Sequence, residues 1–131
     1  MKKLLLLLSL LILPFSSIAA GGDPFGLLTV DQVSDRLGKT EVYVFDANNV
    51  TRYKEGHLPG ASHVEFNKYS EKALPKNREA TLIFYCYNPA CTASHEAAKR
   101  AIKFGYKNVF VMSAGIEGWK NAKKPVQSGT N

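Results

Sequence analysis

Apolar and polar positions follow one another in short blocks that predict strands and helices in turn. Residues 81–85 are apolar almost throughout, which is typical of a central strand of a parallel sheet, buried on both faces. Residues 92–104 place alanine and isoleucine at helical spacing, with Gly105 as the stop. Further strands are predicted at 42–45, 63–66 and 109–112, and further short helices at 29–38, 49–56 and 115–122, with a weak helical turn in the polar stretch 67–80. We expect an α/β fold: a small open, mostly parallel sheet flanked by helices.

The first twenty residues differ from the rest and predict a cleaved signal peptide. Lys2 and Lys3 precede an apolar run from 4 to 13, and a small-residue exit follows from 14 to 20. The run is too short to span a bilayer comfortably, and no cysteine near the cut would carry a lipid. We expect a periplasmic or secreted protein without a stable membrane anchor; a retained anchor is the alternative.

The remaining chain, about 111 residues, has the size of one domain. We expect a flexible leader at 21–27, the domain at 28–126 and a frayed tail at 127–131. The full chain has a formal net charge of +6, which falls to +4 without Lys2 and Lys3. Its basic residues are scattered without interleaved aromatics, so no nucleic-acid partner is expected.

Cys86 follows the most strand-like segment and stands just before the predicted helix at 92. Backbone N–H groups of such a loop, together with the helix dipole, stabilise an anion. A thiol there ionises more readily, and the thiolate is the reactive form. The alternative is a buried, inert cysteine.

The second cysteine, Cys91, is only five positions from Cys86. A disulfide that closes so small a loop constrains the unfolded chain little, so it would stabilise the fold only weakly. This favours a chemical role for the cysteines over a structural one, and a redox-labile disulfide is a further alternative. Cys91 is either a resolving thiol that attacks a persulfide or sulfenate on Cys86, or a small packing residue.

Four motifs together resemble those of single-domain rhodaneses, over nearly the whole predicted domain. Each is weak alone, but their order and spacing match the family. They are Val44-Phe45-Asp46; Tyr53-Lys54-Glu55-Gly56-His57-Leu58-Pro59-Gly60-Ala61; Tyr85-Cys86; and Gly105-Tyr106-Lys107-Asn108-Val109 with Gly115-Ile116-Glu117-Gly118-Trp119.

The resemblance implies a rhodanese-like fold and a sulfurtransferase that needs no cofactor. Cys86 would accept sulfur from a small donor (thiosulfate, polysulfide or a persulfide) and pass it from its persulfide to cyanide or a thiol acceptor, which can be a protein. Pro89 has no N–H to offer, and the Thr92 hydroxyl is expected to cap the helix. The loop N–H groups implied to bind the thiolate or persulfide belong to Tyr87, Asn88, Ala90, Cys91 and Thr92.

Two departures from the family pattern concern the donor. Many members have an arginine where this chain has Cys91, and often a second where it has Asn48. Without these cations thiosulfate is a weaker candidate, and an uncharged persulfide-type or protein donor is favoured. A phosphatase activity, which needs the loop arginine, is disfavoured.

Asp46 and His95 are accessory candidates near the loop. Asp46, at a predicted strand end, is expected to orient loop N–H groups or a neighbouring side chain, and His95 to polarise a donor or simply to pack. His57 is expected to bond the backbone of its turn. The cysteines and histidines lack a standard ligand spacing, so no metal is expected. The competing functions are a thiol–disulfide redox protein using Cys86 and Cys91, and a non-catalytic sulfur-carrying or protein-binding module.

Overall fold

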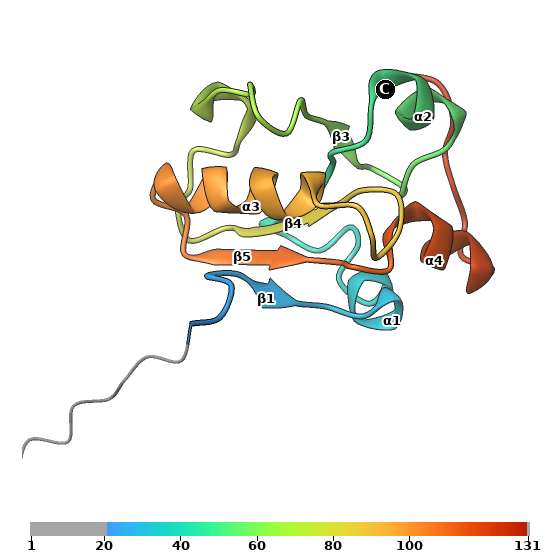
Figure 1. Ribbon diagram of the computed structural model, residues 1–131, viewed down its shortest axis with the longest axis horizontal. Coiled ribbons are helices and arrows are strands. Elements are labelled where there is room, and N and C mark those ends of the chain that lie inside the picture. Colours follow the sequence, from blue (N-terminus) through green and yellow to red (C-terminus); the bar gives the residue numbers. More distant parts are fainter. Residues whose placement is uncertain (1–20, 131) are drawn as a thin grey trace, which may run out of the picture.

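Over residues 21–130, which the computed structural model describes, five strands form one parallel sheet with helices on both faces (Figure 1). The strand order is β1-β5-β4-β2-β3. The predicted fold class, an open parallel sheet flanked by helices, is confirmed. The strands are β1 (Gly26–Leu27), β2 (Val42–Asp46), β3 (Ser62–His63), β4 (Thr81–Tyr85) and β5 (Asn108–Val111), and the helices are α1 (Val30–Ser34), α2 (Val50–Glu55), α3 (Ala93–Lys103) and α4 (Gly115–Asn121), with a 3-10 turn at Glu71–Ala73.

Strand β4 lies in the middle of the sheet and has the bounds that its apolar pattern predicts. It is hydrogen-bonded to β2 on one side and β5 on the other. Because side chains alternate along a strand, Leu82 and Phe84 pack on one face, together with Cys86 just beyond the strand. Ile83 and Tyr85 pack on the opposite face. The alternation therefore directs Cys86 and Tyr85 to different sides of the sheet.

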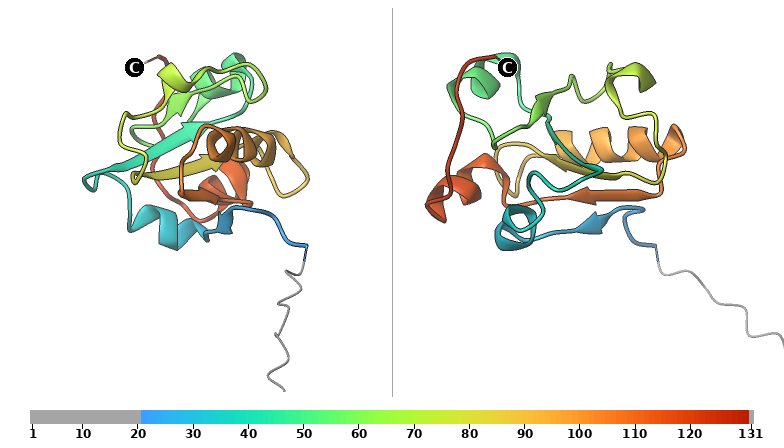
Figure 2. Two further views of the ribbon diagram at one scale, coloured as in Figure 1. Left: turned by 90° about the vertical axis from the view of Figure 1, so that its left-hand side faces the viewer. Right: turned by 180° about the vertical axis from the view of Figure 1, so that it is seen from behind.

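The helices divide between these two faces, as the views from the side and from behind show (Figure 2). Helix α3 packs against one face through Ala97, Ala98 and Ala101, whose small side chains allow close approach to the sheet. Val33 of α1 and Trp119 of α4 pack in the core of the other face. The start of α3 thus lies on the side of the sheet to which Cys86 points.

Two predicted elements differ in extent from the structure. The strand expected at 63–66 is β3, Ser62–His63, because the chain turns at 66–68, where the N–H groups of Lys68 and Tyr69 both donate to the Glu65 carbonyl at 3.0 Å. Helix α1 starts with the expected capping box at Thr29 but ends at Ser34. Turns fill the residues up to Gly38, the expected stop.

The domain begins before residue 28, so the leader expected at 21–27 is too long. Phe25 is buried and meets the His95 ring edge-on, and Gly26–Leu27 pair with β5. A side chain at Gly26 would overlap the Phe110 ring, which explains a glycine there. The predicted signal peptide, 1–20, lies outside the described residues. Within 21–130 the helices are all too short or too polar to cross a membrane.

The expectation of a frayed tail at 127–131 is wrong for its first residues. The last segment runs from α4 to α2 (Figure 1). Gln127 exchanges both backbone hydrogen bonds with His57, at 2.8 and 2.9 Å, and its side-chain oxygen accepts from Gly60 N–H at 2.9 Å. Gly129 N–H donates to the Lys54 carbonyl at 2.8 Å. These bonds fix the tail on the turn that follows α2.

A chain ending at Val126 should lose about 1–2 kcal/mol of unfolding free energy, because these four hydrogen bonds disappear while ordering of the tail is no longer needed. Urea denaturation of this chain and of one ending at Gly129, which keeps the bonds, measures the difference. Equal midpoints for the two chains would show that the tail does not stabilise the domain.

Candidate active site

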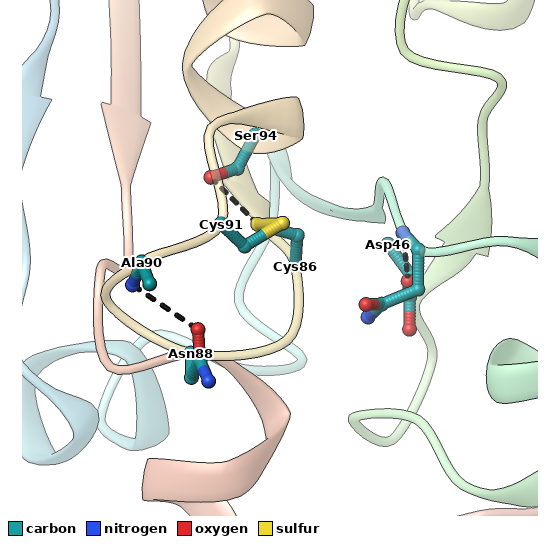
Figure 3. The surroundings of a disulfide bond; sticks show 7 residues. Asp46, Cys86, Asn88, Ala90, Cys91 and Ser94 are labelled. Carbon is teal, nitrogen blue, oxygen red and sulfur yellow. Dashed lines mark hydrogen bonds between the residues drawn. A yellow bond between two sulfur atoms is a disulfide. The ribbon is translucent and has the colours of Figure 1, made fainter.

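Cys86 directly follows β4 at the carboxyl end of the sheet, as its sequence position predicts. Its side chain belongs to the core cluster beneath α3, and the residue is only 2% exposed. It is joined by a disulfide to Cys91, which is partly exposed (Figure 3). Both cysteines of the chain are therefore paired with each other, and whether the bridge is redox-labile stays a prediction.

Ser94, in the first turn of α3, is the polar neighbour of the buried sulfur. Its Oγ lies 3.4 Å from Cys86 Sγ (Figure 3), and because a disulfide sulfur has no proton, the hydroxyl is the donor. The residue is 1% exposed. A Cys86 thiolate would accept this hydrogen bond and lie near the positive end of the helix dipole, and both effects lower a thiol pKa.

Two of the five loop N–H groups that were expected to bind the thiolate form hydrogen bonds within the loop. Cys91 N–H donates to the Asn88 carbonyl at 3.0 Å, and Ala90 N–H to the Asn88 side chain at 3.1 Å (Figure 3). With the disulfide closed, these two groups bond the loop itself instead of facing the sulfur. The expected capping role of Thr92 is wrong, because its hydroxyl makes no cap hydrogen bond and its backbone is helical.

Helix α4 fixes the start of the loop. Ile116 N–H donates to the Cys86 carbonyl at 2.9 Å, and Glu117 N–H to the Tyr87 carbonyl at 3.0 Å. Gly115 makes this approach possible, because its φ is +66° and a Cβ there would overlap the Tyr87 carbonyl. The backbone of Cys86 and Tyr87 is thus anchored, whereas Pro89 and Ala90 are exposed.

Asp46 lies on the opposite face of the sheet from the disulfide and orients its neighbours, as expected. Its Oδ2 accepts from the Tyr85 hydroxyl at 2.6 Å and its Oδ1 from Asn48 N–H at 2.7 Å. The Tyr85 oxygen in turn accepts from Leu58 N–H at 3.0 Å. Asp46 therefore supports the strand end that carries Cys86 through Tyr85, without contacting the sulfur.

Burial determines the ionisation of this pair. Loss of water raises the pKa of Asp46 above its ordinary value, although hydrogen bonds from Tyr85 and Asn48 oppose part of the effect. Burial, followed by the charge of Asp46, raises the pKa of Tyr85. Tyr85 consequently remains a neutral hydrogen-bond donor.

The three histidines have structural partners. His95 packs against Phe25, with ring centroids 5.1 Å apart, which matches the packing role weighed for it. His57 Nδ1 lies 2.7 Å from the Tyr53 carbonyl, the backbone bond expected in its turn. His63 Nε2 lies 2.8 Å from the Asn48 carbonyl and so donates to it. Over residues 21–130, no three His, Cys, Asp or Glu side chains gather as a metal site would require.

An open cleft of about 450 Å³ lies beside the disulfide and reaches Cys91. Arg52 of α2 lines it, with its guanidinium 3.9 Å from the centroid of the Tyr87 ring. Sequence reasoning missed both Arg52 and Ser94. The spacing of Ser94, Ala97, Ala98 and Ala101 could have placed Ser94 on the buried face of α3, but the sequence contains no signal that brings Arg52 to the loop.

Comparison with known proteins identifies the family. The model of the rhodanese-like domain matches residues 29–122, and the chain belongs to this family. Thiosulfate sulfurtransferase GlpE of Coxiella burnetii is 27% identical over 82 residues, which cover 63% of this chain and 75% of that protein.

Two solved structures show the same fold. The BH2092 protein of Bacillus halodurans has a TM-score of 0.73 at 27% identity, covering 79% of this chain and 77% of its own. SseA of Escherichia coli, described as a 3-mercaptopyruvate sulfotransferase, has a TM-score of 0.68 at 20% identity. The alignment covers 82% of this chain and 52% of the SseA chain. At the level of the family, the match to the rhodanese-like domain and the similarity to GlpE support sulfur transfer.

Replacing Gly115 by Ala should lower the unfolding free energy by about 2–4 kcal/mol, because strain at positive φ adds to overlap with the loop backbone. Gly38→Ala is a matched control, since its φ is +74° but no atom lies within 4 Å of the added Cβ. That variant should lose about 1 kcal/mol, from strain alone. Equal losses in urea denaturation would contradict the proposed overlap.

Asp46→Asn should change how stability depends on pH. Between the ordinary aspartate pKa and the raised pKa of the folded protein, the native state keeps a proton that the unfolded chain has lost. Unfolding free energy of the wild type therefore falls as pH rises through this range, and the variant lacks this loss. Denaturation at a series of pH values from 4 to 8 measures the free energy of unfolding of both proteins. The variant should become more stable relative to the wild type as the pH rises; a difference that does not change with pH would contradict the raised pKa of Asp46.

Proposed function

We propose that this protein is an exported sulfurtransferase that carries sulfane sulfur as a persulfide on Cys86. The observation that carries the proposal is the position of Cys86: it heads the loop between the central strand and α3, with its sulfur 3.4 Å from the Ser94 hydroxyl. Membership of the rhodanese-like family supplies the reaction class.

The reaction has two halves. The Cys86 thiolate attacks the outer sulfur of the donor, a Cys86–sulfur bond forms, and the donor's own bond to that sulfur breaks. The rest of the donor leaves with the electron pair, as sulfite does from thiosulfate. A thiolate or cyanide then attacks the terminal sulfur, so that Cys86 returns as thiolate and the acceptor leaves as persulfide or thiocyanate.

The disulfide is the resting, oxidised form in this scheme. A sulfur that is 2% exposed and bonded to Cys91 cannot attack a donor, so a reductant must first open the loop. We infer that an uncharged persulfide-type donor is preferred to thiosulfate, since Cys91 replaces the loop arginine that in relatives can pair with an anionic donor. A disulfide within the loop also suits the oxidising compartment to which the predicted signal peptide would direct the chain.

Reduced protein treated with polysulfide should gain the mass of one sulfur atom on Cys86, and cyanide should then release thiocyanate. Cys86→Ser should lower thiocyanate formation at least about 100-fold, because the nucleophile is lost. Cys91→Ser is the matched control: it should keep activity and remain active without a reductant. Thiosulfate should turn over slowly.

Sulfur found on Cys91, or undiminished turnover by Cys86→Ser, would contradict the proposal. Thiosulfate turnover comparable to that of arginine-bearing relatives would contradict the inferred donor preference alone. Cys91 attack on a Cys86 persulfide, which releases sulfide and forms the disulfide, would appear as sulfide release in the wild type and not in Cys91→Ser.

The second candidate function is thiol–disulfide exchange, which the observed bridge favours. In that case the reduced protein would reoxidise by passing electrons to a partner disulfide, without taking up sulfur. Redox titration of the Cys86–Cys91 pair together with the persulfide assay separates the two functions, because only a sulfur carrier gains mass.

A further inference from the structure

The two bonded sulfurs are unequal in their access to solvent. Cys86 is 2% exposed in the core beneath α3, whereas Cys91 is partly exposed and borders the cleft of about 450 Å³. A thiol approaching from solvent through this cleft meets Cys91, which lines it, and not the buried Cys86. Access decides which sulfur of a disulfide is attacked when the two are otherwise alike.

The charged side chains that line this cleft are Arg52, Lys68 and Glu65, and the imidazole of His63 lines it as well. Lys68 Nζ lies 3.9 Å from Glu65 Oε2, so these two charges offset each other. The Arg52 guanidinium forms no ion pair within residues 21–130. The cleft therefore offers one uncompensated positive charge.

Arg52 is also oriented toward the loop. Its guanidinium lies over the ring of Tyr87, the residue that follows Cys86, at 3.9 Å from the ring centroid. Stacking on a ring face leaves the N–H groups at the edge of the guanidinium available to an anion. Two neighbouring N–H groups of a guanidinium can donate together to the oxygens of a planar carboxylate or of a sulfonate.

We propose that this cleft binds an anionic low-molecular-weight thiol, one that carries a carboxylate or sulfonate, and that Arg52 anchors its charged group while its sulfur attacks Cys91. Such a thiol would be the reductant that activates Cys86 for the proposed sulfur transfer. Opening of the disulfide does not depend on that function; only the later reaction of the Cys86 thiolate with a sulfur donor does.

The exchange balances in two steps. The incoming thiolate forms a bond to Cys91 Sγ, the Cys86–Cys91 bond breaks, and Cys86 leaves with the electron pair as a thiolate that accepts the Ser94 hydrogen bond. A second thiolate attacks the small-molecule sulfur of the mixed disulfide and releases the Cys91 thiolate. Two thiols are oxidised to one disulfide as the protein disulfide is reduced.

The test uses the purified disulfide-bonded protein without any sulfur donor. Mercaptoethanesulfonate, mercaptoethanol and cysteamine serve as anionic, neutral and cationic thiols, and opening rates are compared at equal thiolate concentration. In the wild type the anionic thiol should react about threefold to fivefold faster than the neutral one, the range expected for an exposed charge pair. The cationic thiol should be slowest, and added salt should reduce the differences.

Arg52→Gln should abolish the preference, and Arg52→Lys should keep part of it. Arg36→Gln is the control: that guanidinium donates to the Gln32 carbonyl on α1, remote from the cleft, so the preference should persist. Urea denaturation verifies that each variant is folded. An unchanged order of rates in Arg52→Gln would overturn the role of Arg52.

Peptide mapping identifies the sulfur that is attacked. Quenching early with N-ethylmaleimide in urea should give the small thiol on Cys91 and the maleimide on Cys86; the reverse pattern would overturn the proposal. Failure of the sulfurtransferase function would instead appear as no sulfur on Cys86 in reduced protein, with the thiol preference intact.

Discussion

The site depends on the alternation of side chains at the end of β4. Tyr85 and Cys86 are consecutive, so they leave the central strand on opposite faces of the sheet. On one face, Tyr85 bonds buried Asp46 and Leu58 N–H and so fixes the strand end. On the other, the sulfur of Cys86 lies under the first turn of α3, beside Ser94. The polar network thus supports the strand end that carries Cys86 without contacting its sulfur.

The loop itself combines an anchored and an exposed half. Main-chain N–H groups of α4 hold the carbonyls of Cys86 and Tyr87, while Asn88 bonds the N–H groups of Ala90 and Cys91. Breaking the bridge leaves the first set of bonds intact. The contacts that hold Cys86 and Tyr87 to α4 are therefore main-chain hydrogen bonds that do not involve the disulfide.

Local patterns in the sequence were sufficient for most of the fold. The apolar run at β4 and the capping residues Thr29 and Asn49 fixed elements at or near their observed positions, since these signals act over a few residues. The docking of Gln127 on His57 and the pairing of β1 were missed because both involve partners far along the chain. The same limit applies to the site: the position of Cys86 was predicted, but the stacking of Arg52 on Tyr87 was not.

The two edge strands, β1 and β3, contain only two residues each. An edge this short presents few unpaired backbone groups to another chain, so strand addition is a poor route for self-association or for capture of an extended peptide. The described part of the chain therefore presents side chains, and not an open sheet edge, to whatever molecule contacts it.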